Sequence, residues 1–235
     1  MKILTAEQVK QADAYTIKHE PIKSIDLMER AASKCFDWIY EKAPDLFSGF
    51  TEEREWTFHV VVGPGNNGGD GLVIARMLNK MGYNVHISHV KLSDKGSPDF
   101  ETNYGKLGKL KKEVLEIKEE SDLIDYPEKA IIVDAIFGTG LNRPPEGIAA
   151  KVIEKINQSG ATVVSIDLPS GCFSEDNSDN DLRYVVHSEY VLTFQVPKLA
   201  FYLAESASVI GSVVVLDIGL SDQFLKDIEV THHLL

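Results

Sequence analysis

The segment Val60–Arg76 reads VVVGPGNNGGDGLVIAR, so an apolar run meets a glycine-rich loop and then a second apolar run. The first run predicts a strand over 57–62, and the spacing of the apolar residues after the loop predicts a helix over about 70–81. The glycines of the loop permit close backbone approaches, so several N–H groups can point at one anion beside the positive end of the helix dipole. The segment therefore predicts a strand–loop–helix unit that binds a phosphate group.

The composition favours a soluble intracellular protein of one α/β domain. The chain has 235 residues, of which 43% are hydrophobic, and this is enough for one core. Its net charge of −12 opposes binding to nucleic acid and to anionic membranes. Cys35 and Cys172 are too few for a disulfide scaffold, and no apolar stretch approaches membrane-spanning length. We therefore expect a cytoplasmic protein without a nucleic-acid or membrane partner.

The domain is expected to cover residues 1–230. The last five residues, 231–235, carry no signal of a packed element and are interpreted as a tail or a truncated linker. A second domain can follow if the natural chain is longer.

Two helices precede an alternation of strands and helices. Thr5 and Gln8 form a capping-box pattern for a first helix that ends near His19, and Ser24 is the expected cap of a second helix that ends near Glu41. The alternation of strands and helices after these two helices predicts a mostly parallel sheet with helices on both faces. The expected strands are 57–62, 83–90, 130–136, 162–166, 190–194 and 212–217, and the later helices are about 70–81, 100–110, 120–125 and 145–158.

Three predicted strand ends carry polar residues beside small ones. The first is the loop Gly63–Asp70, the second follows Asp134 with a Gly-Thr-Gly turn at 138–140, and the third starts at Asp167 and continues Leu-Pro-Ser-Gly. The carboxyl ends of parallel strands share one edge of a sheet, where ligands of open α/β sheets bind. We therefore expect these three loops to line one crevice.

Simpler interpretations compete with each motif. Gly63, Gly65 and Gly68 match the G-x-G-x-x-G dinucleotide fingerprint, but Pro64 removes one N–H, and the next strand end, His89–Leu92, lacks the acid that binds a ribose. This weakens a conventional nicotinamide redox site. Asp134 and Asp167 taken singly are also typical of turns and caps. Lys198 fits a phosphate contact and a solvated surface position equally well.

Four segments together resemble the YjeF N-terminal domain family, the NAD(P)HX epimerases. They are Val62–Gly71, Val133–Leu141, Asp167–Gly171 and Thr193–Lys198, in the order seen in that family. The resemblance covers nearly the whole chain and includes Leu27-Met28-Glu29 in the second helix. One departure is visible, because Arg30-Ala31-Ala32 stands where the family often has Asn-Ala-Gly. The resemblance implies a Rossmann-like three-layer α/β/α fold behind the two N-terminal helices.

The resemblance also implies roles for particular residues. Asp167 is expected to contact substrate and to act as the catalytic acid and base. Potassium is the expected cofactor, with side-chain oxygens from Asn67, Asp134 and Ser170; oxygen donors suit such a hard cation. The other expected substrate contacts are Asn66, Asn67, Gly68, Gly69, Asp70, Gly138, Thr139, Gly140, Leu141, Asn142, Arg143 and Pro144.

The implied activity is interconversion of the R and S epimers of hydrated NADH or NADPH, a cofactor-repair reaction. The expected partners are a second copy of the chain, in a homodimer, and an ADP- or ATP-dependent NAD(P)HX dehydratase, fused or separate. Two other functions stay open: a non-catalytic nucleotide-binding or interaction module of the same fold, and an NAD(P)-dependent oxidoreductase. The presence of Asn67, Asp70, Asp134, Asp167 and Ser170 favours a working catalytic site.

Overall fold

A seven-stranded sheet forms the centre of the molecule. The computed structural model describes residues 2–46, 56–109, 113–230 and 232–233. The sheet order is β4-β3-β2-β5-β6-β7-β8, and all neighbouring strands are parallel, as predicted. The strands are β2 (Thr57–Val62), β3 (Asn84–Val90), β4 (Val114–Ile117), β5 (Ile131–Ala135), β6 (Thr162–Ile166), β7 (Ser188–Phe194) and β8 (Ile210–Leu216).

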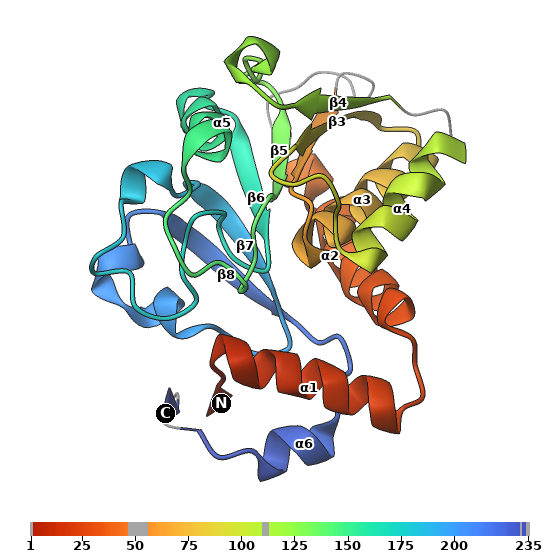
Figure 1. Ribbon diagram of the computed structural model, residues 1–235, viewed down its shortest axis with the longest axis vertical. Helices are drawn as coiled ribbons and strands as arrows, with labels where there is room; N and C mark the ends of the chain where they lie inside the picture. The colour runs from red at the N-terminus through yellow and green to blue at the C-terminus, as the bar shows by residue number, and fades with distance from the viewer. Residues whose placement is uncertain (1, 47–55, 110–112, 231, 234–235) are drawn as a thin grey trace.

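Helices cover both faces of this sheet, which confirms the predicted three layers. Helices α2, α3 and α4 pack on one face and α5 on the other (Figure 1). Alternate residues of β2 serve the two cores: Val60 packs toward α3, and Val61 packs toward α5. Within the described ranges, no helix is long and apolar enough to cross a membrane. The helices are α1 (Ala6–His19), α2 (Ser24–Leu46), α3 (Asn66–Lys80), α4 (Pro98–Lys109), α5 (Gly147–Gln158) and α6 (Asp222–Asp227), with 3₁₀ turns at Glu120–Asp122, Leu182–Tyr184, Leu199–Tyr202 and Ala204–Ser206.

The two N-terminal helices form as expected, with one difference at the start of the second. The Thr5 hydroxyl accepts from the Gln8 backbone N–H at 3.2 Å, and the Gln8 side chain accepts from the Thr5 N–H at 3.0 Å, which confirms the capping box. Ser24 is the first residue of α2, and its hydroxyl donates to Asp99 at 2.6 Å instead of capping the helix. Helix α2 also continues to Leu46, beyond the expected end near Glu41.

Three short segments differ from the sequence predictions. Strand β4 was not predicted, because it has four residues and, among the described strands, pairs with β3 alone at the sheet edge. The helix expected over 120–125 is a single 3₁₀ turn, in which Asp122 accepts from the N–H groups of Lys118 and Glu119. His232–His233, assigned to a tail, forms β9 and pairs antiparallel with β1, Lys2–Ile3. The domain boundary at residue 230 stays a prediction.

The strand order reverses between β2 and β5, so the loops that follow these two strands are neighbours. Val62 is in register with Ala135, and the Gly63 N–H donates to the Ala135 carbonyl at 3.1 Å. Ligands of open α/β sheets bind at such a reversal, outside the carboxyl ends of the strands. The topology therefore places the glycine-rich loop beside the loop that follows Asp134.

Candidate functional site

A cleft of about 700 Å³ opens at the carboxyl ends of the strands. This volume lies within the range of about 300–1,000 Å³ that is usual for small-molecule sites. The loops after β2, β5 and β6 line it, and α1 and α2 form a further wall. The expected substrate contacts that line it are Asn66, Asn67, Asp70, Gly138, Thr139, Gly140, Leu141, Asn142, Arg143 and Asp167.

Gly68, Gly69 and Pro144 do not line the cleft. Helix α3 begins at Asn66, earlier than expected, so the polar residues of the loop occupy its first turns. A Cβ on Gly68 would lie 1.8 Å from the Gly63 carbonyl oxygen, and one on Gly63 would lie 2.1 Å from the Ile136 carbonyl oxygen. Gly63 and Gly68 are therefore required for packing of α3 on the strand ends.

The N-terminus of α3 faces the cleft with no side-chain cap. Gly65 is the N-cap residue and provides no side-chain hydrogen bond to the first turn. The first N–H groups of a helix have no partner within the helix and, with the helix dipole, attract anions. Pro64, Gly65 and Asn66 line the cleft at this point, so a phosphate group can approach these N–H groups.

The three expected potassium ligands lie together beneath the cleft, around Phe137. The Ser170 backbone N–H donates to Asp134 Oδ2 at 2.9 Å, and the Phe137 N–H donates to Ser170 Oγ at 2.9 Å. Asn67 Nδ2 donates to the Phe137 carbonyl at 2.7 Å. Asn67 from α3 and Ser170 from the loop after β6 thus meet at the backbone of Phe137, and Ser170 connects them to Asp134 of β5.

Two features of this cluster fit a bound cation. Asn67 Oδ1 is buried and has no hydrogen-bond partner. The side chain of Asp134 is fully buried, yet its partners in the described part of the chain are hydroxyl and N–H groups rather than a cationic side chain. Burial raises the pKa of Asp134, while the hydrogen bonds from Ser170 and Ser165 oppose that shift. Oxygen donors of this kind suit a hard cation.

Asp167 is held by an unusual turn at the end of β6. Its backbone has φ of 66°, a region that residues other than glycine seldom adopt. Its N–H donates to the Leu192 carbonyl at 2.7 Å, and the Leu168 N–H closes a tight turn on the Ile166 carbonyl at 2.8 Å. Strained backbone of this kind is concentrated at functional sites. The turn places the Asp167 side chain in the cleft.

Lys198 is the partner of Asp167. Its Nζ lies 2.7 Å from Asp167 Oδ1 and donates to Thr193 Oγ1 at 2.8 Å. Lys198 is 1% exposed, so it is neither a solvated side chain nor an open phosphate contact, and both interpretations from the sequence are wrong. A buried lysine requires such a carboxylate partner. The sequence did not identify the pair, because Asp167 and Lys198 lie far apart along the chain.

Two further carboxyl groups, Asp13 and Asp70, share the cleft with Asp167. Burial, followed by repulsion from Asp167, raises the pKa of Asp13 to about 6 despite the opposing charge of Lys198. Burial also raises the pKa of Asp70 well above its usual value, with added repulsion from Asp167 and Asp13. Asp13 was not predicted from the sequence as a residue of the site. It stands four residues from both Val9 and Ile17, and this spacing on one face of a helix was the available signal.

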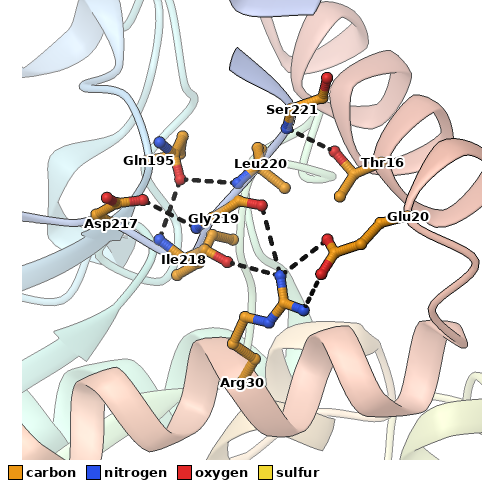
Figure 2. Close-up of polar contacts among 9 residues, drawn as sticks. All are labelled: Thr16, Glu20, Arg30, Gln195, Asp217, Ile218, Gly219, Leu220 and Ser221. Atoms are coloured by element: carbon orange, nitrogen blue, oxygen red, sulfur yellow. Dashed lines mark hydrogen bonds and ion pairs between the residues drawn. The ribbon is translucent and has the colours of Figure 1, made fainter. Parts of the chain in front are cut away.

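Arg30, at the departure from the family pattern, joins three parts of the cleft wall (Figure 2). Its guanidinium pairs with Glu20 at 2.5 Å and donates to the carbonyls of Ile218 and Gly219 at 3.4 Å each. Ala31, the next residue of α2, lines the cleft. Arg30 therefore connects the end of α1 with the segment that follows β8.

Known proteins resemble this chain in sequence and in structure. The chain is 33% identical to an NAD(P)H-hydrate epimerase of Anaerococcus prevotii over 97% of this chain and 100% of the relative. It is 34% identical to a bifunctional NAD(P)H-hydrate repair enzyme Nnr of Thermofilum pendens over 97% of this chain, and there it spans 42% of the relative. The crystal structure of the yeast protein ynu0 superposes with a TM-score of 0.76, covering 99% of this chain and 96% of that chain at 23% identity. The family model described as YjeF-related protein N-terminus matches residues 24–200, and the chain belongs to this family.

Proposed function

We propose that this chain is an NAD(P)H-hydrate epimerase, which interconverts the R and S epimers of hydrated NADH or NADPH. The observation that carries the proposal is the pair of Asp167 and buried Lys198 in the cleft, 2.7 Å apart, at the strand ends beside an uncapped helix N-terminus. The pair supplies a positioned proton-transfer group, and the helix N-terminus supplies an anion site. The name of the A. prevotii relative, covered in full by this chain, supports the same activity.

The substrate is a dinucleotide. One end of the cleft suits its pyrophosphate, and the other end suits its hydrated nicotinamide ring. Its pyrophosphate is placed at the N-terminus of α3, beside Gly65 and Asn66, where the N–H groups are free of side-chain caps. Lys10 and Arg143 add positive charge among the cleft-lining residues. The hydrated nicotinamide ring then lies toward Asp167 and the turn at 138–140.

The chemistry takes place at C6 of the hydrated ring, which carries a hydroxyl group beside the ring nitrogen. A protonated carboxyl group gives its proton to this hydroxyl, the C6–O bond breaks with its electron pair on oxygen, and the nitrogen lone pair forms a C=N bond. Water then adds to either face of the planar cation, and a carboxylate takes the proton from it. The ring gains and loses one water, so no oxidant or reductant is consumed. Asp167 is a proton-transfer group in this scheme.

The cluster of Asn67, Asp134 and Ser170 would hold potassium. The buried, unpartnered Asn67 Oδ1 and the buried Asp134 carboxylate support this assignment. A bound cation would supply fixed positive charge beneath the loops that hold the substrate. These residues themselves join the first turn of α3 to the loops after β5 and β6. They therefore fix the position of the phosphate site relative to Asp167.

The decisive experiment follows the ratio of purified R and S hydrates during incubation with the chain. An epimerase brings the two to equilibrium without consuming the nicotinamide cofactor. An oxidoreductase changes the redox state of the cofactor instead, and a binding module alters neither. Asp167→Asn should slow equilibration about 10²–10⁴-fold. Asp179→Asn, which alters an exposed loop carboxylate, is the control and should keep wild-type activity. A wild-type chain that leaves the ratio unchanged would refute the proposal.

Three further properties belong to the same proposal. The name of the T. pendens relative supports a second repair activity on the same substrate, which we infer to be an ADP- or ATP-dependent dehydratase in another domain or chain. A homodimer and a cytoplasmic location stay predictions. Sedimentation of the purified chain tests the homodimer, and a fluorescent fusion tests the location.

A further inference from the structure

Helix α1 carries a carboxyl group into the cleft on an otherwise mostly apolar face. Val9, Asp13 and Ile17 follow one another at intervals of four residues, and all three line the cleft. Asp13 is half-buried, and among the described residues its side chain has neither a hydrogen bond nor an ion pair. Carboxylates are rarely buried without a partner. The contacts that hold α1 in the described part of the chain do not involve this carboxyl group.

The position of Asp13 is held firmly by its neighbours along the helix. Ala12 packs in a buried cluster with Leu220, and the Ser221 N–H donates to Thr16 Oγ1 at 3.0 Å. Figure 2 shows this contact together with the Arg30–Glu20 pair, which fixes the end of α1 against the segment after β8. The helix that bears Asp13 is therefore a fixed wall of the cleft.

The charged groups around Asp13 come from several elements. Lys10 lies one turn earlier on α1, Arg143 lies on the loop after β5, and Asp70 lies on α3; all three line the cleft. Burial is the largest cause that raises the pKa of Asp13, repulsion from Asp167 at the end of β6 adds to it, and Lys198 after β7 opposes both, with a net value of about 6. A carboxyl group with such a pKa can hold a proton near neutral pH and release it again.

Asp167 and Asp13 differ in their charged neighbours. Lys198 Nζ lies 2.7 Å from Asp167 Oδ1, so the Asp167 carboxyl group is held in an ion pair with a buried lysine. Asp13 has no cation within bonding distance in the described part of the chain. Pairs of carboxyl groups in unlike environments commonly divide the acid and base roles.

We propose that Asp13 is a second catalytic residue of this cleft and donates the proton to the hydroxyl group that leaves C6, while Asp167 accepts the proton from the water that adds. The inference rests on the proposed epimerase function. The C6–O bond breaks as the Asp13 O–H proton moves to the hydroxyl oxygen and water leaves. The new C6–O bond forms as the water proton moves to Asp167. The proton then returns from Asp167 to Asp13 through solvent, and no redox change occurs.

Asp70 is the competing proton donor. Asp70 is more deeply buried than Asp13, and this makes Asp13 the better candidate. Asp70 is 8% exposed and lies in the early turns of α3, near the site assigned to the pyrophosphate. A donor that gives up its proton in each turnover needs exchange with solvent, which half-buried Asp13 retains. Asp70→Asn is therefore included as a comparison in the test.

The test compares Asp13→Asn with Glu7→Gln, which removes an exposed carboxylate from the same helix. We expect kcat for epimerisation to fall at least about 10²-fold in Asp13→Asn, with KM changed less than about threefold. Glu7→Gln should keep wild-type values. Asp13→Glu retains the acid and should recover part of kcat. Thermal unfolding of each variant verifies that the fold is kept.

The pH profile separates proton donation from a structural role. In the wild type, kcat/KM, corrected for the uncatalysed rate, should decline above about pH 6, because the Asp13 proton is lost there. This alkaline decline should disappear in Asp13→Asn and persist in Glu7→Gln.

The outcomes distinguish this inference from the proposed function. A folded Asp13→Asn variant with kcat within about threefold of wild type refutes the assignment of Asp13 and leaves the epimerase proposal standing. An alkaline decline that disappears in Asp70→Asn but not in Asp13→Asn assigns the donor role to Asp70 instead. A wild-type chain that does not epimerise the hydrates refutes both proposals.

Discussion

Replacement of Lys198 by methionine tests how strongly the fold depends on the buried ion pair. Lys198 is 1% exposed, and its Nζ lies 2.7 Å from Asp167 Oδ1. Methionine fills similar space but leaves the Asp167 carboxylate without its counter-charge, beside Asp13 and Asp70. Removing one partner of a buried pair costs about 3–5 kcal/mol. The Asp167 side chain keeps 12% exposure, and water at that surface places the expected loss at the lower end, about 3 kcal/mol.

For a domain of this size, about 3 kcal/mol corresponds to a fall in Tm of roughly 6–12 °C. Urea unfolding at pH 7.5 measures the loss of free energy for Lys198→Met, Asp167→Asn and the double variant. The double variant removes both charges of the pair, so its loss should be smaller than the sum of the single losses by about 2–3 kcal/mol. A loss below about 1 kcal/mol for Lys198→Met, or strict additivity, would refute the claim that the two groups form a coupled buried pair.

The remaining predictions concern stability and the cation site. Asp13→Asn should raise the free energy of unfolding at pH 7.5 by about 1–3 kcal/mol, because the folded protein holds the Asp13 proton up to about pH 6, whereas the unfolded chain releases it near 3.8. The ionised carboxyl thus destabilises the fold above pH 6, and the gain, measured by urea unfolding across pH, should vanish below about pH 4. Gly68→Ala should cost at least about 2 kcal/mol, because its Cβ would lie 1.8 Å from the Gly63 carbonyl oxygen, whereas Gly65→Ser, where no atom lies within 4 Å, should cost less than about 0.5 kcal/mol in the same denaturation assay. Activity should survive EDTA but fall when potassium is replaced by choline, and Asp134→Asn should regain part of its lost activity at high potassium; restoration by zinc or magnesium instead would contradict the potassium assignment.

Local patterns in the sequence determined the elements that contain the site. The β-branched runs at 57–62 and 162–166 form strands close to the predicted bounds, because each is buried on both faces and reads as a continuous apolar segment. Thr5 and Gln8 cap α1 as expected, since a capping box depends only on residues three positions apart. The position of Asp167 at a strand end, facing a crevice, also follows from the order of the strands.

Tertiary structure decided which side chains act together. Strand β4 forms because β3 offers it an edge, and its four residues carry no comparable local signal. Lys198 meets Asp167 through a buried contact between the turn after β6 and the chain after β7, and a lysine in a sequence looks the same whether it is solvated or paired. Asp13 lines the cleft because α1, which is bonded to the segment after β8, lies against other elements of the fold. Periodicity along the chain predicts local conformation and burial, whereas the pairing of charges depends on distances between elements that no local pattern encodes.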